Sequence, residues 1–123
     1  ALLIPAKGSA QINSDAIKTS AGALYKLPVV RCKDLKESVR YLKESGITLF
    51  AATEKTDQLY TEADFNKPSA LILGNEGEGI SPELLRMTDH LLRIPLMGEI
   101  DSLNVSVAAG ILLYETIRQR TTL

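Results

Sequence analysis

The hydrophobic residues of this chain fall into short apolar runs separated by amphipathic or polar stretches. The first run, A-L-L-I, is stopped by Pro5 and is typical of a buried parallel strand. Such runs predict strands over residues 1–4, 27–32, 47–52, 69–73 and 90–94. Because helical patterns and short loops lie between them, the sequence predicts one α/β domain over residues 1–123, with a mainly parallel sheet flanked by helices.

The clearest helical signal covers residues 35–45. Apolar side chains recur there at i, i+4 and i+7 and predict an inner face. Asp34 followed by Glu37 is a reciprocal capping pattern, and Gly46 provides a left-handed stop. The inner face holds Leu35, Val39 and Leu42, and the outer face holds Lys36, Arg40 and Lys43.

Three other stretches carry weaker helical signals. A cap at Asn13 or Ser14 predicts a helix that runs to about Ala21. Residues 53–67 lack a clear period and predict a loop with one short helical turn near residues 60–65. The sequence Ser81-Pro82-Glu83 has a cap, a proline at the first helical position and an acid in the first turn, and so predicts a short helix.

A helix that opens near Asn104 has almost no polar residue from Val105 to Leu113. That composition predicts a helix buried nearly all round. It could be a plain core helix, or it could pack on the sheet with one face and on a second subunit with the other. In a chain this short the second arrangement covers the helix most easily, so we expect a homodimer with residues 104–118 in its interface.

The composition excludes several classes of protein. No apolar run reaches 18 residues, so no membrane span is expected. Cys32 is the single cysteine, which excludes an internal disulfide and a cysteine-based metal site and fits a reducing cytoplasm. His90 is the only histidine, and at a strand entrance we expect it to be structural rather than part of a catalytic triad.

The net charge of −1 argues against electrostatic binding of nucleic acid by the whole chain. The two parts of the chain nevertheless differ: residues 1–45 hold eight basic and four acidic side chains, and residues 46–123 hold six and eleven. The first part could therefore contact RNA on one side, although a solvated helix surface explains the same counts.

A glycine-rich turn, G-N-E-G-E-G, follows the apolar run at residues 69–73. Its spacing is not that of a dinucleotide-binding loop, and it lacks the lysine of a P-loop. Glu76 and Glu78 also disfavour a phosphate, which prefers bare N–H groups and positive charge. A ligand with a positive centre and no phosphate suits this turn better, and a purely structural turn is the alternative.

Two segments together resemble the second and third sequence motifs of the SpoU (TrmH-like) branch of the SPOUT RNA methyltransferases. They are G-N-E-G-E-G-I, which starts at Gly74, and I-P-L-M-G-E-I-D-S-L-N-V-S-V-A-A-G, which starts twenty residues later. The resemblance extends from A-L-L-I-P to R-Q-R, and A-G-A-L-Y-K-L-P-V-V-R is most similar to enzymes that methylate a guanosine ribose in large-subunit ribosomal RNA.

The resemblance implies an α/β fold with a deep trefoil knot at its C-terminal end, a homodimer, and S-adenosylmethionine as cofactor. Carried over to this chain, the family's cofactor contacts fall on Gly74, Ile94 and Leu103, with the backbone of Gly77, Pro95 and Met97 close by. The residues nearest the chemistry are Glu76, Asn104 and Ser106. The family's first motif, with an Asn and a catalytic Arg, is absent, so we expect a segment to be missing before Ala1.

The chemistry of the cofactor agrees with these residues. S-adenosylmethionine carries a sulfonium cation and no phosphate, and backbone groups of Gly- and Pro-bent loops can bind its adenine and ribose. Methyl transfer to a ribose 2′-OH requires alignment and deprotonation of the hydroxyl. We assign the deprotonation to the absent Arg or a neighbour, the orientation of this Arg to Glu76, and the holding of loop, cofactor and ribose to Asn104 and Ser106. Helix capping and a solvated turn carboxylate are the alternatives.

Two other functions stay open at this point. A noncatalytic RNA-binding module could keep the same knotted fold, and an enzyme of the same fold could act on transfer RNA. The target nucleotide cannot be named, because its recognition would depend on the missing N-terminal part and on RNA shape.

Overall fold

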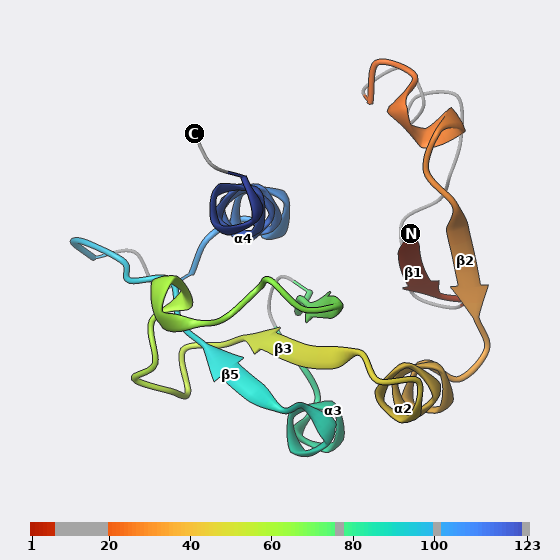
Figure 1. Ribbon diagram of the computed structural model, residues 1–123. Coiled ribbons are helices and arrows are strands. Elements are labelled where there is room, and N and C mark those ends of the chain that lie inside the picture. The colour runs from red at the N-terminus through yellow and green to blue at the C-terminus, as the bar shows by residue number, and fades with distance from the viewer. Residues whose placement is uncertain (7–19, 76–77, 100–101, 122–123) are drawn as a thin grey trace. The chain divides into compact units, whose positions relative to one another are not determined.

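The computed structural model describes residues 1–6, 20–75, 78–99 and 102–121 (Figure 1). The chain forms two compact units, residues 1–39 and residues 40–123. The predicted alternation of strands and helices is confirmed, and every strand pair in the structure is parallel. The strands form two sheets, one in each unit, instead of the single sheet that the sequence predicts.

The first unit contains a two-stranded sheet. β1 (Leu2–Pro5) runs parallel to β2 (Val29–Cys32), with Leu2 opposite Val29. Pro5 ends the strand, as expected, and the next amide donates to the carbonyl of Cys32 over 2.9 Å. The prediction that this strand is buried is wrong, because Leu2 is 40% exposed and β2 is the only partner strand of β1 in the described part of the chain.

The predicted helix from Asn13 or Ser14 to about Ala21 falls mostly outside the described residues. At its expected end, Ala21 and Gly22 have φ angles of 53° and 82° and form a left-handed turn, and the helix itself stays a prediction. A short 3-10 helix, η1 (Ala23–Tyr25), follows this turn.

α2 (Leu35–Glu44) confirms the clearest helical prediction. A carboxylate oxygen of Asp34 accepts from the backbone N–H of Lys36 over 3.0 Å and so satisfies one free donor at the helix start. Gly46 has a φ of 86° and stops the helix as predicted. On the inner face Val39 is buried, whereas the three basic side chains of the outer face are exposed.

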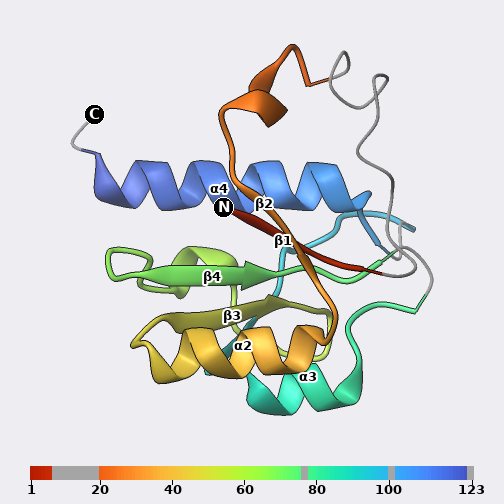
Figure 2. The ribbon, with the colours of Figure 1, turned by 90° about the vertical axis from the view of Figure 1, so that its right-hand side faces the viewer.

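The second unit is organised around β3 (Thr48–Ala52), which pairs in parallel with β4 (Ser69–Ile72) on one side and with β5 (His90–Leu92) on the other. Leu49, Phe50 and Ala51 are at most 2% exposed, as a strand covered on both faces requires. In both views α4 and α3 lie on opposite sides of β3 (Figures 1 and 2).

A small aromatic core fixes the connection between β3 and β4. The rings of Phe50 and Phe65 lie 4.8 Å apart, and Ala63 and Leu92 are buried in the same cluster. The connection contains η2 (Tyr60–Glu62), which confirms the predicted helical turn. The β3–β4 connection therefore needs no longer helix, because the side chain of Phe65 packs it against the core.

α3 (Pro82–Met87) begins as the sequence predicts. The hydroxyl of Ser81 accepts from the backbone N–H of Leu84 over 3.3 Å, and Pro82 occupies the first helical position.

α4 (Val105–Arg120) is the longest helix of the described chain. The prediction that it is buried nearly all round is wrong for the single chain. Leu112 and Glu115 face the core, whereas one side remains open. This open apolar side comprises Val107, Leu113, Tyr114 and Ile117, which are 50–75% exposed. A helix at the surface of one chain can cover only the side that meets its own sheet and loops.

The C-terminal half of α4 is held to the β3–β4 connection by a polar cluster. Gln119 accepts from the backbone N–H of Phe65 over 2.7 Å and donates to the carbonyl of Ala63 over 2.8 Å. Arg120 donates to the carbonyls of Phe65 and Lys67 over 2.6 and 2.7 Å.

Glu115 is the buried member of this polar cluster, with 7% of its side chain exposed. Arg118 binds both of its carboxylate oxygens, over 2.9 and 2.6 Å, and Gln119 donates a further hydrogen bond over 3.1 Å. The hydrogen bonds from Arg118 lower the pKa of Glu115, against the opposing effect of burial. The ionised form is therefore the one that the folded chain stabilises.

We predict that Glu115→Gln lowers the free energy of unfolding by about 2 kcal/mol at neutral pH, since charge-assisted hydrogen bonds are lost. A lowered folded-state pKa stabilises the fold above the unfolded pKa and loses that effect as pH falls, so the difference from the parent should shrink below roughly pH 4. Urea unfolding at two pH values measures this. Glu54→Gln, at an exposed position, is the matched control, and an equal deficit at both pH values would contradict the assignment.

Candidate functional site

The candidate site lies at the carboxyl edge of the three-stranded sheet, where both motif segments leave it. β4 and β5 flank β3 and run in the same direction, so Gly74 and Ile94, each two residues beyond a strand end, emerge at the same edge. Two neighbours of one strand lie about 10 Å apart. Ligand sites of parallel α/β sheets form at such edges.

The turn after β4 depends on a glycine at position 74. A Cβ atom built there would lie 2.5–2.7 Å from backbone atoms of Gly79 and Ile80, closer than any packing allows. Gly79 has a φ of 70°, and its backbone N–H donates to the carbonyl of Asn75 over 3.2 Å. The chain therefore closes on itself directly beyond the strand.

Asn75 also binds this turn through its side chain, which accepts from the backbone N–H of Glu78 over 3.2 Å. Asn75 is not among the site residues predicted from the sequence. The signal is present, because asparagine within a glycine-rich turn commonly binds the backbone a few residues on. The predicted contacts of Glu76 and Gly77 lie outside the described residues.

Backbone hydrogen bonds hold the segment that follows β5 before the chain turns. Arg93 donates its backbone N–H to the carbonyl of Gln58 over 2.7 Å, and its carbonyl accepts from the N–H of Tyr60 over 3.0 Å. Beyond this point Gly98 has a φ of 83°. Of the predicted cofactor residues, Ile94 and Leu103 are half-buried, whereas Pro95 and Met97 are exposed.

Asn104 and Ser106 are in direct contact at the start of α4. The side-chain oxygen of Asn104 accepts from the backbone N–H of Ser106 over 2.9 Å and from its hydroxyl. Asn104 is thus the cap of the helix, as the alternative interpretation expects. Both side chains are exposed, so the cap does not exclude a contact with a ligand.

His90 has a packing contact, which agrees with its predicted structural position. Its ring stacks on Phe50 with centroids 5.2 Å apart and an interplanar angle of 25°. Within residues 1–6, 20–75, 78–99 and 102–121, no cluster of three or more His, Cys, Asp or Glu side chains is arranged to hold a metal ion. None of the helices in that part of the chain is long and apolar enough to cross a bilayer.

Comparison with known protein families gives one match that spans most of the chain. Residues 1–114 match the SpoU rRNA Methylase family. The chain belongs to the SpoU rRNA Methylase family. The matched residues include both motif segments and the start of α4, so the family assignment covers the sheet edge described above.

Individual relatives agree with the family. The chain is 41% identical over 119 residues to an uncharacterized tRNA/rRNA methyltransferase of Synechocystis sp., covering 97% of this chain and 31% of that protein. It is 37% identical over 122 residues to the 23S rRNA (guanosine-2′-O-)-methyltransferase RlmB of Photorhabdus laumondii, covering 99% of this chain and 50% of that protein. The chain thus spans half or less of these relatives.

Solved structures share the fold. The SpoU methyltransferase AviRb of Streptomyces viridochromogenes, in complex with the cofactor AdoMet, superposes with a TM-score of 0.87 at 30% identity. The match covers 97% of this chain and 47% of AviRb. The parallel α/β architecture of this chain is therefore that of the SpoU methyltransferases.

We predict that Gly74→Ala opens the turn after β4, because the added methyl group meets the backbone of Gly79 and Ile80. Overpacking of this kind costs about 1–3 kcal/mol, which urea unfolding would measure. Glu78→Ala in the same turn is the control, since the side chain is exposed and the bond to Asn75 uses the backbone N–H. A Gly74→Ala chain as stable as the control would show that the turn is not tightly closed.

Proposed function

We propose that this chain is part of the catalytic domain of an enzyme that methylates a ribose 2′-OH in RNA, with a guanosine of large-subunit ribosomal RNA as the target. The observation that carries the proposal is the emergence of both motif segments at one sheet edge in a chain of the SpoU family. RlmB, a 23S rRNA guanosine methyltransferase, is 37% identical to this chain and supports the choice of substrate.

S-adenosylmethionine is the cofactor that we propose, and it would supply the methyl group. AviRb binds AdoMet with the same fold, which supports this choice. In this chain the half-buried Ile94 and Leu103 offer apolar surface for an adenine ring, and the bent backbone from Pro95 to Gly98 offers hydrogen-bonding groups. The closed turn at Gly74 would border the cofactor, together with Gly77 and Met97.

The catalytic roles follow the resemblance. Asn104 and Ser106 hold the loop, the cofactor and the ribose, and Glu76 orients an arginine that the family places before the region of Ala1. The contact between Asn104 and Ser106 supports a shared role, since one amide oxygen fixes both groups. A neutral thioether leaves, so the protein has only to align the hydroxyl and assist removal of its proton.

The remaining properties that we propose also follow the family. They are a trefoil knot formed by the C-terminal segments, a cytoplasmic location where ribosomal RNA is available, and action without a metal. A transfer RNA substrate is the second candidate, because the Synechocystis relative is named a tRNA/rRNA methyltransferase.

The test of the activity is transfer of tritium from labelled cofactor to ribosomal RNA by the full-length gene product. A methylated 2′-oxygen cannot attack its phosphate, so the labelled nucleoside should sit in an alkali-resistant linkage. Label on a base would overturn the reaction assignment. Label on transfer RNA alone would select the second substrate, and binding of RNA without transfer would indicate a noncatalytic module.

We predict that Asn104→Asp lowers turnover about tenfold to a hundredfold while the fold keeps its stability, because aspartate caps a helix as well as asparagine does but cannot donate to a ligand. Asn104→Ala should lower both turnover and stability, the latter by about 1 kcal/mol. Methyl transfer and urea unfolding measure the two effects. Full activity of Asn104→Asp would leave capping as the only role of this residue.

A homodimer is the assembly that we propose, with the open apolar side of α4 in the interface. This side exposes large apolar residues along a helix whose other side faces the core. Contiguous exposed apolar surface of this kind marks interaction sites. Gly110 lies within the same side, and a side chain there would meet open space in the single chain.

We predict that Ile117→Lys, at a side chain 50% exposed, converts the dimer to a monomer without unfolding the chain, since a charge would be buried in the apolar interface. Sedimentation at micromolar concentration measures the mass. Tyr41→Lys is the control, because Tyr41 is 70% exposed and belongs to a different helix, α2. A parent chain that sediments as a monomer would reject the dimer.

A further inference from the structure

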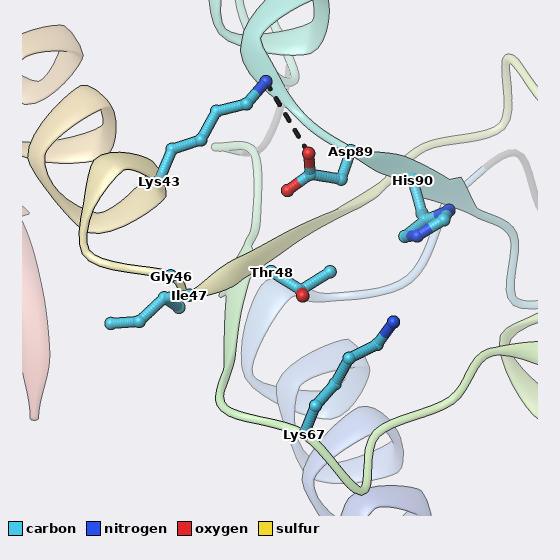
Figure 3. A pocket seen from close by; sticks show the side chains of 7 residues that line it. All are labelled: Lys43, Gly46, Ile47, Thr48, Lys67, Asp89 and His90. Atoms are coloured by element: carbon cyan, nitrogen blue, oxygen red, sulfur yellow. Dashed lines mark ion pairs between the residues drawn. The ribbon is translucent and has the colours of Figure 1, made fainter.

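The amino edge of the three-stranded sheet carries a hollow that lies opposite the proposed methyl-transfer edge. Its volume is about 360 Å³, and side chains that precede or begin all three strands line it (Figure 3). Thr48 begins β3, His90 begins β5, and Lys67 lies two residues before β4. Lys43, from the last turn of α2, and Asp89 complete the polar lining.

The one carboxylate of this lining already has partners. One oxygen of Asp89 accepts from the backbone N–H of Leu49 over 2.8 Å, and the other lies 3.6 Å from the ammonium of Lys43. Lys43 donates in addition to the carbonyl of Met87 over 3.1 Å. The negative charge in the hollow is thus compensated by a lysine of the same hollow.

Lys67 brings a second positive charge to the hollow. Its side chain extends toward the space between Thr48 and His90 (Figure 3). Asp64, a carboxylate close to Lys67, is outside the lining, and it accepts from the backbone and side-chain nitrogens of Asn66 over 3.0 and 3.2 Å. Hydrogen bonds from Asn66, with a smaller contribution from Lys67, lower its pKa, so Asp64 stays charged and weakens the field of Lys67 only in part.

We propose that this hollow binds a phosphate group of the RNA backbone. Lysine ammoniums bind phosphate as point charges, and a threonine hydroxyl and an imidazole add hydrogen-bond donors. Phosphate contacts hold a nucleic acid in register and carry no sequence information. The hollow would thus be a second contact site for the RNA substrate, away from the ribose that is methylated.

The distance between the two edges suits this role. His90 and Ile94 are four residues apart along β5, and Lys67 and Gly74 are seven residues apart along β4, so the hollow lies about 13–23 Å from the motif edge. One helical turn of a nucleic acid spans about 34 Å, so a bound RNA reaches both places. The inference depends on the proposed function in one respect, namely that the bound phosphate belongs to RNA.

The test is the affinity of the protein for a fluorescently labelled ribosomal RNA fragment, measured by anisotropy at several salt concentrations. Lys67→Ala should weaken binding about threefold to tenfold and reduce the salt slope by about one. Asp89→Asn should tighten binding about twofold to fivefold, because the amide oxygen can still accept from Leu49 while the negative charge is removed. Lys55→Ala, at an exposed lysine of the β3–β4 connection, is the control and should change neither quantity.

Opposite signs for Lys67→Ala and Asp89→Asn separate an electrostatic site from a structural one, since general damage would weaken binding in both variants. Equal affinities of Lys67→Ala and Lys55→Ala would overturn the proposal.

The source of the phosphate is tested by NMR titration with inorganic phosphate and with the RNA fragment in parallel. Shifts of the Thr48, Lys67 and His90 amides with both ligands support the inference, and shifts with inorganic phosphate alone would assign the hollow to a free anion instead of RNA. No shift with either ligand rejects it. If the shifts occur but no RNA is methylated, the proposed activity fails while the phosphate site stands.

Discussion

The parallel pairing of β3 with strands on both of its sides is the constraint on which the second unit depends. Leu49, Phe50 and Ala51 are buried on both faces, so these three positions can carry no side chain that needs water. Parallel neighbours also force every connection to cross from one edge of the sheet to the other. The result is that the two motif segments meet at the carboxyl edge, and the polar residues that precede the strands meet at the amino edge.

The sequence predicts best where several local signals agree. α2 has an apolar period, a capping aspartate and a stop glycine that all indicate the same bounds, and the structure confirms them within one residue. The helix expected up to about Ala21 has a cap signal at Asn13 or Ser14 and a glycine, Gly22, just beyond its end. The left-handed turn at Ala21 and Gly22 agrees with an end near this point, because a residue with positive φ cannot continue a helix, but the helix itself lies mostly outside the described residues.

Some features of the candidate site could likewise be predicted from local sequence signals, and others could not. The glycine requirement at Gly74 and the cap at Asn104 are local and could be predicted from the motif letters. The burial of α4 could not be predicted in this way. The composition of an apolar helix indicates how much of its surface should be buried, but not which side is buried by its own chain. Glu115 had a local signal, an arginine three residues on, but its burial and the bonds of Gln119 to Ala63 and Phe65 are tertiary.

The bond between Gln119 and Ala63 joins residues 56 positions apart. While the chain is being made, the backbone groups of Ala63 and Phe65 have no access to these partners until α4 has been synthesised. At about 5–20 residues per second, that interval is roughly 3–11 s, long compared with the formation of a helix or the closure of a short loop. The backbone groups of Ala63 and Phe65 therefore depend on water for these hydrogen bonds during that interval and gain their protein partners only when residues 119 and 120 have been made.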